Sequence, residues 1–118
     1  MVKILTVDDA YFVRIKLRNF LESKGFQVVE AGNGLEAVSQ FEKENPDIVF
    51  CDITMPEMDG LATLKKLKEL SPDVKVVMLT SLGEQTVLME ALAAGALNFL
   101  VKPFEEDKVL EIINSLVK

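Results

Sequence analysis

Five short apolar runs alternate along the chain with five segments in which apolar residues recur at helical spacing. The runs predict strands at residues 3–7, 26–29, 48–51, 74–79 and 97–101. The segments between them predict helices at residues 10–24, 33–45, 61–70, 84–94 and 106–117. Because right-handed crossovers leave few other topologies, this alternation predicts an α/β fold with a five-stranded parallel sheet and helices on both of its faces.

The length and composition fit one compact unit. The chain has 118 residues, of which 49% are hydrophobic, and no internal repeat, linker or low-complexity segment divides it. We therefore expect residues 1–118 to form a single domain with a sizeable core. The formal net charge of -6 argues against non-specific binding to nucleic acid, which needs a basic surface. An acidic chain suits a divalent cation or a basic partner surface instead.

Cysteine and histidine usage excludes several kinds of chemistry. Cys51 is the single cysteine, and histidine is absent from the sequence. An intramolecular disulfide, a multi-cysteine metal site and catalysis by a Ser–His or Cys–His pair are therefore excluded. The N-terminus has no signal-peptide pattern, and no apolar run approaches the roughly 20 residues that span a bilayer. We expect a soluble cytoplasmic protein that binds neither nucleic acid nor membrane.

Three aspartates stand at the ends of two predicted strands. Asp8 and Asp9 follow the first strand, and Asp52 follows the third. The carboxyl ends of parallel strands form the edge where open α/β sheets bind ligands. Unpaired carboxylates at one edge would raise one another's pKa, and a hard cation such as Mg²⁺ would relieve their repulsion. The sequence thus predicts a metal site made by Asp8 or Asp9, Asp52 and a backbone carbonyl just beyond Asp52. A simpler alternative is that Asp8 and Asp9 cap the first helix.

A loop should separate Asp52 from the third helix, because Pro56 and the Asp59–Gly60 pair interrupt regular structure. We interpret Asp59 as a turn residue rather than a ligand. Cys51 lies in the most buried predicted strand and is interpreted as a small hydrophobic residue rather than a redox group.

Four motifs resemble the receiver domain of two-component response regulators, and together they extend over essentially the whole chain. They are Val7-Asp8-Asp9, Asp52 with Met55-Pro56 and Asp59-Gly60, Leu79-Thr80, and Lys102-Pro103-Phe104. Each motif is weak alone, but their order, spacing and positions at successive strand ends are specific. The chain is most similar to the stand-alone, CheY-like members. This resemblance implies a flavodoxin-like, doubly wound fold with strand order 2-1-3-4-5.

The resemblance also implies a role for each site residue. Asp52 is the phosphoacceptor, and Mg²⁺ is held by Asp8, Asp9, Asp52 and the backbone carbonyl of Thr54. Lys102 and Thr80 contact the phosphoryl group, and the Lys102–Pro103 peptide bond is cis. Such a protein is not an enzyme beyond catalysing its own phosphorylation and dephosphorylation.

Partners and switching follow from the same resemblance. A sensor histidine kinase donates the phosphate, and a downstream effector protein binds the surface of the fourth helix, fifth strand and fifth helix, either in chemotaxis or in a phosphorelay. Thr80 and Phe99 would couple the site to that surface, although Phe99 lacks the hydroxyl of the tyrosine common at this position. Thr54 and Leu82 flank the site without an acid or amide, so we expect moderately slow self-dephosphorylation. The protein is expected to be a monomer; dimerisation on activation stays open.

Three other classes of function are compared with this one. A phosphatase with an aspartate nucleophile and Mg²⁺ would need a second acid where Thr54 stands. A flavin-binding module of this fold would need a hydroxyl-rich phosphate loop where Asp8 and Asp9 stand. A phosphate-independent interaction module would have no use for intact acceptor, metal and lysine positions. The sequence therefore favours a phosphorylation-driven switch.

Overall fold

The computed structural model describes residues 1–55 and 58–117 and contains the predicted alternation of strands and helices. The strands are β1 (Lys3–Val7), β2 (Gln27–Ala31), β3 (Ile48–Asp52), β4 (Val76–Thr80) and β5 (Asn98–Val101). The helices are α1 (Tyr11–Ser23), α2 (Gly34–Glu44), α3 (Gly60–Leu70), α4 (Gln85–Ala93) and α5 (Glu106–Leu116). Pro56, which we expect to shape the loop after β3, lies outside the described residues.

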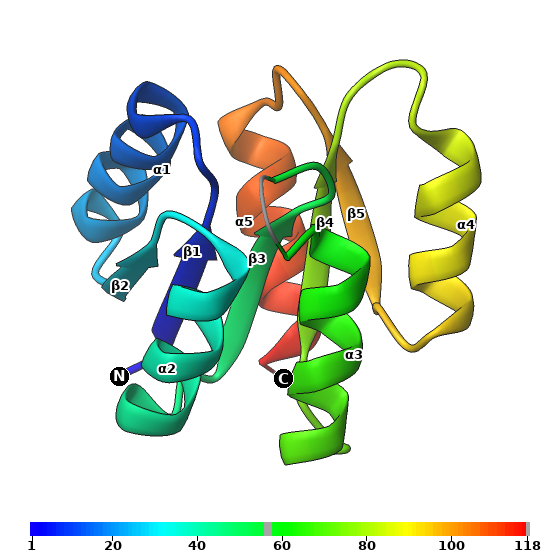
Figure 1. The fold of residues 1–118 in the computed structure, drawn as a ribbon. Coiled ribbons are helices and arrows are strands. Elements are labelled where there is room, and N and C mark those ends of the chain that lie inside the picture. The colour runs from blue at the N-terminus through cyan, green and yellow to red at the C-terminus, as the bar shows by residue number, and fades with distance from the viewer. Residues whose placement is uncertain (56–57, 118) are drawn as a thin grey trace.

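The five strands form one parallel sheet in the order β2-β1-β3-β4-β5 (Figure 1). The predicted fold class and strand order are therefore confirmed. Every strand runs in the same direction, so the carboxyl ends of all five lie at the upper edge of the sheet in Figure 1. The loops that follow β1, β3, β4 and β5 gather at that edge.

Helices cover both faces of the sheet, with α1 and α5 on one face and α2, α3 and α4 on the other (Figure 1). Alternate side chains of each strand enter two separate apolar clusters, as a sheet covered on both faces requires. In β1, for example, Ile4 packs with the cluster under α1 and α5, whereas Leu5 packs with the cluster under α2 to α4. In β3, Phe50 and Cys51 divide in the same way.

Several element boundaries differ from the prediction, for local reasons. β4 begins at Val76 rather than at Val74, because the Val74 N–H donates to the Ser71 carbonyl, 3.0 Å away, in the turn after α3. β2 continues to Ala31 because it pairs in parallel with Val7 at the end of β1. These shifts do not alter which side chains of each strand enter each apolar cluster.

Side-chain caps fix the starts of α2 and α3. The Asn33 Oδ1 accepts the Glu36 N–H at 2.8 Å, while the Glu36 carboxylate accepts the Gly32 N–H instead of completing a capping box with Asn33. The Asp59 Oδ1 accepts the Ala62 N–H at 2.9 Å, which confirms that Asp59 belongs to the turn. These hydrogen bonds set the point at which each loop on the carboxyl edge ends.

Gly60 lets the loop after β3 fold back on the strand end. A Cβ at this position would overlap the carbonyl oxygen of Asp52, and the Gly60 N–H donates to the Ile53 carbonyl at 2.7 Å. Only glycine permits this close backbone approach without displacing Asp52. Within the described parts of the chain, the helices are all too short or too polar to cross a membrane.

Candidate functional site

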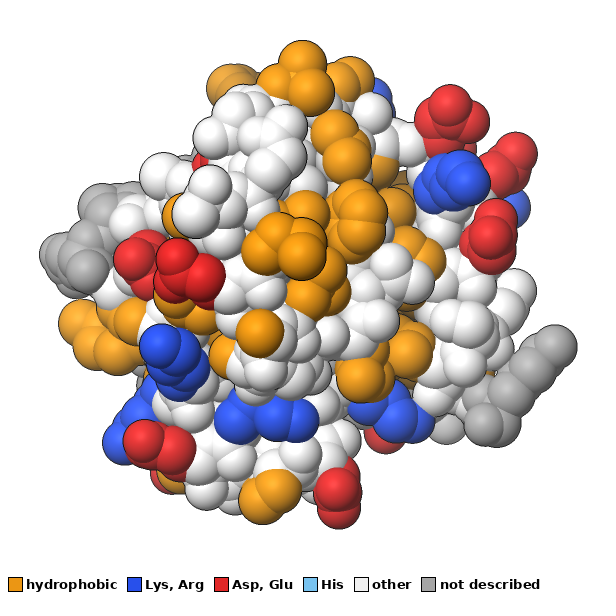
Figure 2. Space-filling model, turned by 90° about the vertical axis from the view of Figure 1, so that its right-hand side faces the viewer, with side chains coloured by type: hydrophobic (Ala, Val, Ile, Leu, Met, Phe, Trp, Pro, Cys, Tyr) orange, Lys and Arg blue, Asp and Glu red, His pale blue; other side chains and the backbone are white. Residues whose placement is uncertain are grey.

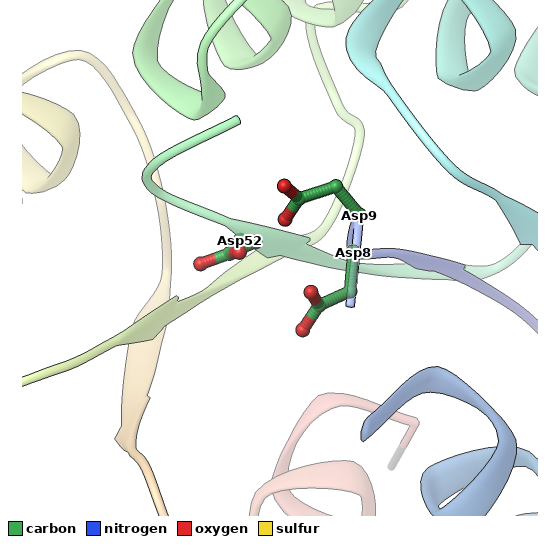
Figure 3. Close-up of side chains that lie close together, drawn as sticks. All are labelled: Asp8, Asp9 and Asp52. Carbon is green, nitrogen blue, oxygen red and sulfur yellow. The ribbon is translucent and has the colours of Figure 1, made fainter. Parts of the chain in front are cut away.

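Three aspartates meet at the carboxyl edge of the sheet. Asp52 is the last residue of β3, and Asp8 and Asp9 directly follow β1, whose Val7 pairs with Cys51. One carboxylate oxygen from each aspartate lies within 4.8 Å of the others, and Figure 3 shows the three side chains around one shared space. Asp8 and Asp52 are buried, with 1% and 6% of their surface exposed, whereas Asp9 is exposed. We call these three residues the acid cluster.

The acid cluster does not cap the first helix. Ala10 is the N-cap residue of α1, and within residues 1–55 and 58–117 no side chain makes the cap hydrogen bond. The Asp8 Oδ1 instead accepts the Ala10 N–H at 2.9 Å, which orders the turn between β1 and α1. The helix-capping alternative is therefore wrong, and the two acids need another explanation.

Lys102 supplies the positive charge of the site. It follows β5, and its backbone N–H donates to the Thr80 carbonyl at 2.7 Å. Its Nζ lies 2.9 Å from the Asp8 Oδ2 and 3.2 Å from the Asp52 Oδ2. The peptide bond between Lys102 and Pro103 is cis, which is the isomer that the resemblance implies.

The electrostatics of the site reflect one cation facing three acids. Burial, followed by the nearby charge of Asp8, raises the pKa of Asp52 to about 6, although Lys102 acts in the opposite direction. Burial lowers the pKa of Lys102, but its contacts with the carboxylates of Asp8 and Asp52 outweigh burial and raise it above its ordinary value. The buried Asp8 Oδ2 has the Lys102 ammonium, 2.9 Å away, as its partner among the described residues. The site therefore has more negative charge and more acceptor capacity than Lys102 alone satisfies.

Thr80 ends β4 on the same edge, next to a residue that the sequence analysis did not identify. The Thr80 Oγ1 lies 3.2 Å from the Glu84 Oε1 and 3.3 Å from the Ser81 carbonyl. The other oxygen of Glu84 accepts a hydrogen bond from the hydroxyl of Thr54. The Ser81-Leu82-Gly83-Glu84 spacing is the pattern of a helix capping box, and this signal was available in the sequence.

The remaining predicted residues lie at the rim or in the core. Thr54 is exposed in the loop after β3, and Leu82 is 87% exposed in the loop after β4. Phe99, which the resemblance assigns to coupling the site to the output surface, is 38% exposed, because β5 is an edge strand. Cys51 is fully buried and packs with the cluster under α2 to α4, and burial raises the pKa of its thiol. The prediction that Cys51 serves as a small hydrophobic residue is confirmed.

Comparison with known proteins identifies the family. The family described as the response regulator receiver domain matches residues 4–114. The chain belongs to this family. It is 46% identical over 113 residues to the chemotaxis protein CheY of Bacillus subtilis, covering 95% of this chain and 94% of that protein. It is also 38% identical over 111 residues to sporulation initiation phosphotransferase F of the same organism, covering 94% of this chain and 90% of that protein.

A solved structure supports the same assignment. The chain is similar to a CheX–CheY–BeF₃–Mg²⁺ complex from Borrelia burgdorferi, with a TM-score of 0.90 and 36% identity over 99% of this chain and 90% of that one. The receiver resemblance deduced from the strand-end motifs is thus confirmed. The protein is a CheY-like receiver of two-component signalling, and receivers of this type are typically signalling domains rather than enzymes.

Proposed function

We propose that this receiver accepts a phosphoryl group on Asp52 from a histidine kinase, with Mg²⁺ bound to the acid cluster, and that residues 1–118 act as one cytoplasmic signalling domain. The observation that carries the proposal is the contact between Lys102 and Asp52, 3.2 Å long, inside a set of three converging carboxylates. A buried nucleophilic carboxylate, a cation beside it and further acids that suit a metal are the groups that phosphoryl transfer requires.

The donor set suits Mg²⁺. Magnesium prefers oxygen ligands and is commonly held by one or two carboxylates together with phosphate oxygens and waters. The acid cluster offers three carboxylates with oxygens within 4.8 Å of one another, and it holds more negative charge than Lys102 offsets. Asp8, Asp9, Asp52 and the backbone carbonyl of Thr54 are the proposed ligands. Bound there, Mg²⁺ would offset negative charge on the carboxylates and on the incoming phosphoryl oxygens.

Asp52 and Lys102 carry out the transfer proposed for this chain. A carboxylate oxygen of Asp52 forms a bond to phosphorus, and the bond from phosphorus to the donor breaks, its electron pair leaving with the donor group. Because the pKa of Asp52 is about 6 in the folded chain, the nucleophilic carboxylate prevails only above that pH. The Lys102 ammonium, already beside Asp52, neutralises charge on a phosphoryl oxygen.

The output surface proposed for this chain lies beside α4 and β5. Figure 2 shows hydrophobic side chains gathered on the face that carries these elements. Met89 in α4, Leu97 before β5, and Phe99 and Val101 in β5 are each between 38% and 65% exposed. An exposed apolar group of this kind suits a protein partner. We propose that phosphorylation draws Thr80 toward Asp52 and changes how this surface binds its effector.

Two output pathways fit the relatives. The similarity to the chemotaxis protein CheY favours control of a motor or another chemotaxis component. The lower similarity to sporulation initiation phosphotransferase F favours relay of the phosphate to a second protein. The higher identity to CheY makes chemotaxis the first pathway to test. The deciding experiment is to ask whether the phosphorylated chain binds a motor component or passes its phosphate to a histidine-containing protein.

Intact mass spectrometry tests the phosphorylation itself. The chain is incubated with acetyl phosphate, with and without Mg²⁺, beside an Asp52→Asn variant. One phosphate is expected on the native chain with Mg²⁺ and none on Asp52→Asn. Phosphate on both chains, or on neither when a cognate kinase is also supplied, would contradict the proposal.

A further inference from the structure

Glu84 joins the two loops that flank the proposed phosphorylation site. It directly precedes α4. Its Oε1 accepts the N–H of Ser81, the first residue after β4, at 2.5 Å and lies 3.2 Å from the hydroxyl of Thr80, the last residue of β4. Its Oε2 accepts the hydroxyl of Thr54, in the loop after β3. One carboxylate therefore receives three donors from two separate segments of the chain.

A helix cap alone does not explain these contacts. Acceptance of the Ser81 N–H by Glu84 resembles the contact of a capping-box glutamate, although Glu84 is itself the N-cap residue of α4 and its side chain makes no cap hydrogen bond. The Thr54 hydroxyl comes from the β3–α3 connection and the Thr80 hydroxyl from the end of β4, and neither contact caps α4. The contacts also matter electrostatically: burial opposes ionisation, but the three donors outweigh it and lower the pKa of Glu84. Glu84 is thus an anion held against the residue proposed to sense the phosphoryl group.

The Thr80 hydroxyl has one proton to donate. In this structure its acceptors are the Glu84 carboxylate and the Ser81 carbonyl. The same proton is needed for a hydrogen bond to a phosphoryl oxygen on Asp52, so Thr80 must release these acceptors first. The phosphoryl group also brings about -1.5 to -2 charges to a site that Glu84 already faces.

We propose that Glu84 is a positioning residue that holds Thr80 and Thr54 in the unphosphorylated arrangement and thereby opposes activation. This inference rests on the proposed phosphorylation of Asp52 and adds a regulator of that site. The contact between Glu84 and Thr80 is broken when Thr80 turns to the phosphoryl group. Removing the Glu84 carboxylate should therefore weaken the unphosphorylated fold and favour the activated one.

Thermal unfolding without Mg²⁺ tests whether the two loops are coupled through Glu84. The variants are Thr54→Val, Glu84→Ala and the double variant. The control is Glu90→Gln, which removes an exposed carboxylate from α4. Each single variant should lower the unfolding temperature, and Thr54→Val should lower it no further once Glu84 is alanine. Additive losses would show that Thr54 does not act through Glu84 and would overturn the inference.

Binding of beryllofluoride, a phosphoryl mimic, tests the opposing role directly. The dissociation constant is measured in the presence of Mg²⁺ by ¹⁹F NMR for the native chain, Glu84→Gln, Glu84→Ala and Glu90→Gln. Glu84→Ala should bind about three- to tenfold tighter than the native chain, because one charged hydrogen bond no longer has to break. Glu84→Gln keeps an oxygen acceptor but loses the charge, so its affinity for beryllofluoride should rise less. The affinity of Glu90→Gln should equal that of the native chain.

The two proposals fail in different ways. If the native chain binds beryllofluoride but Glu84→Ala binds it equally or more weakly, Glu84 is only a helix cap and the inference is wrong. If no chain binds beryllofluoride, the proposed phosphorylation fails and the inference fails with it. A loss of both stability and affinity in Glu84→Ala would mark a purely structural residue.

Discussion

Among the described residues, two clusters of charged side chains at strand ends and edges differ in how their charges are balanced. In the first, Glu30 of β2 faces two arginines of α1: the Arg14 Nε lies 3.0 Å from the Glu30 Oε1, and Arg18 contacts the other carboxylate oxygen. In the second, Lys102 faces Asp8 and Asp52, and Asp9 stands nearby. Arg18 also contacts Glu22, so the first cluster pairs two acids with two cations, whereas three acids share one cation in the second.

The difference separates a structural cluster from a functional one. Both oxygens of Glu30 have a charged partner, so the charges of that cluster are paired within the chain and tie β2 to α1. Arg14 also donates to the backbone carbonyl of Asp8 at 2.6 Å, a contact that does not use the Asp8 carboxylate. The acid cluster leaves an excess of negative charge beside Lys102 and raises the pKa of Asp52 to about 6. An arrangement that costs stability by itself is expected where a ligand completes it.

The largest expected effect on the free energy of unfolding comes from Asp52→Asn, which replaces one acid of the acid cluster with its amide. The folded pKa of Asp52 lies above its ordinary value of 3.8, so folding favours the protonated form. Protonated Asp52 therefore contributes fully to the free energy of unfolding below about pH 4. That free energy falls by roughly 2–3 kcal/mol as the pH rises through about 6. Without Mg²⁺, Asp52→Asn should therefore be more stable than the native chain at pH 7.5 and should lack this loss. Urea unfolding across pH 4–8 measures it.

The exposed acid Asp73 supplies the matched control for this prediction, because Asp73→Asn removes the same charge far from the cluster. Its unfolding free energy should follow the native pH dependence. If Asp52→Asn and Asp73→Asn behaved alike, burial and repulsion at Asp52 would not be the cause.

Removing the one cation should unbalance the acid cluster further. Lys102→Met leaves Asp8 and Asp52 without their close positive partner, and we expect a loss of roughly 1–2 kcal/mol at pH 7.5, limited because Asp52 can take up a proton. Mg²⁺ should stabilise this variant more than it stabilises the native chain, since a second cation replaces the first. Thermal unfolding with and without Mg²⁺ measures both effects, and Lys108→Met, at an exposed lysine of α5, is the control.

The smallest expected effect on the free energy of unfolding comes from the cluster of Glu30 with Arg14 and Arg18. Its sign is opposite to that of Asp52→Asn. Glu30→Gln removes two ion pairs whose acid is only 18% exposed, so we expect a loss of about 1 kcal/mol. The loss should not change with Mg²⁺, as urea unfolding in both conditions would show. A Mg²⁺ effect as large as that of Lys102→Met would mean that the two clusters are not separate.

Much of the fold and of the acid cluster could be predicted from the sequence, because both depend on local pattern. Apolar periodicity fixes the type of each element, and parallel strands bring Asp8, Asp9 and Asp52 to one edge. The links through Glu84 and Glu30 join segments distant in sequence, and periodicity carries no information about them. The edge position of β5 follows from the predicted strand order, but the 38% exposure of Phe99 also depends on how α4 and α5 pack beside that edge, which periodicity does not give.

Calorimetric titration of Mg²⁺ at pH 6, in two buffers of different ionisation enthalpy, tests the central claim most directly, because it measures both binding and proton release. The account predicts a single site on the native chain that releases about half a proton for each Mg²⁺ bound, since Asp52 is close to half protonated at that pH. Asp52→Asn should bind more weakly and release no proton, and Glu30→Gln should match the native chain. Absence of binding, or equal binding by the native chain and Asp52→Asn, would show that the acid cluster is not a metal site.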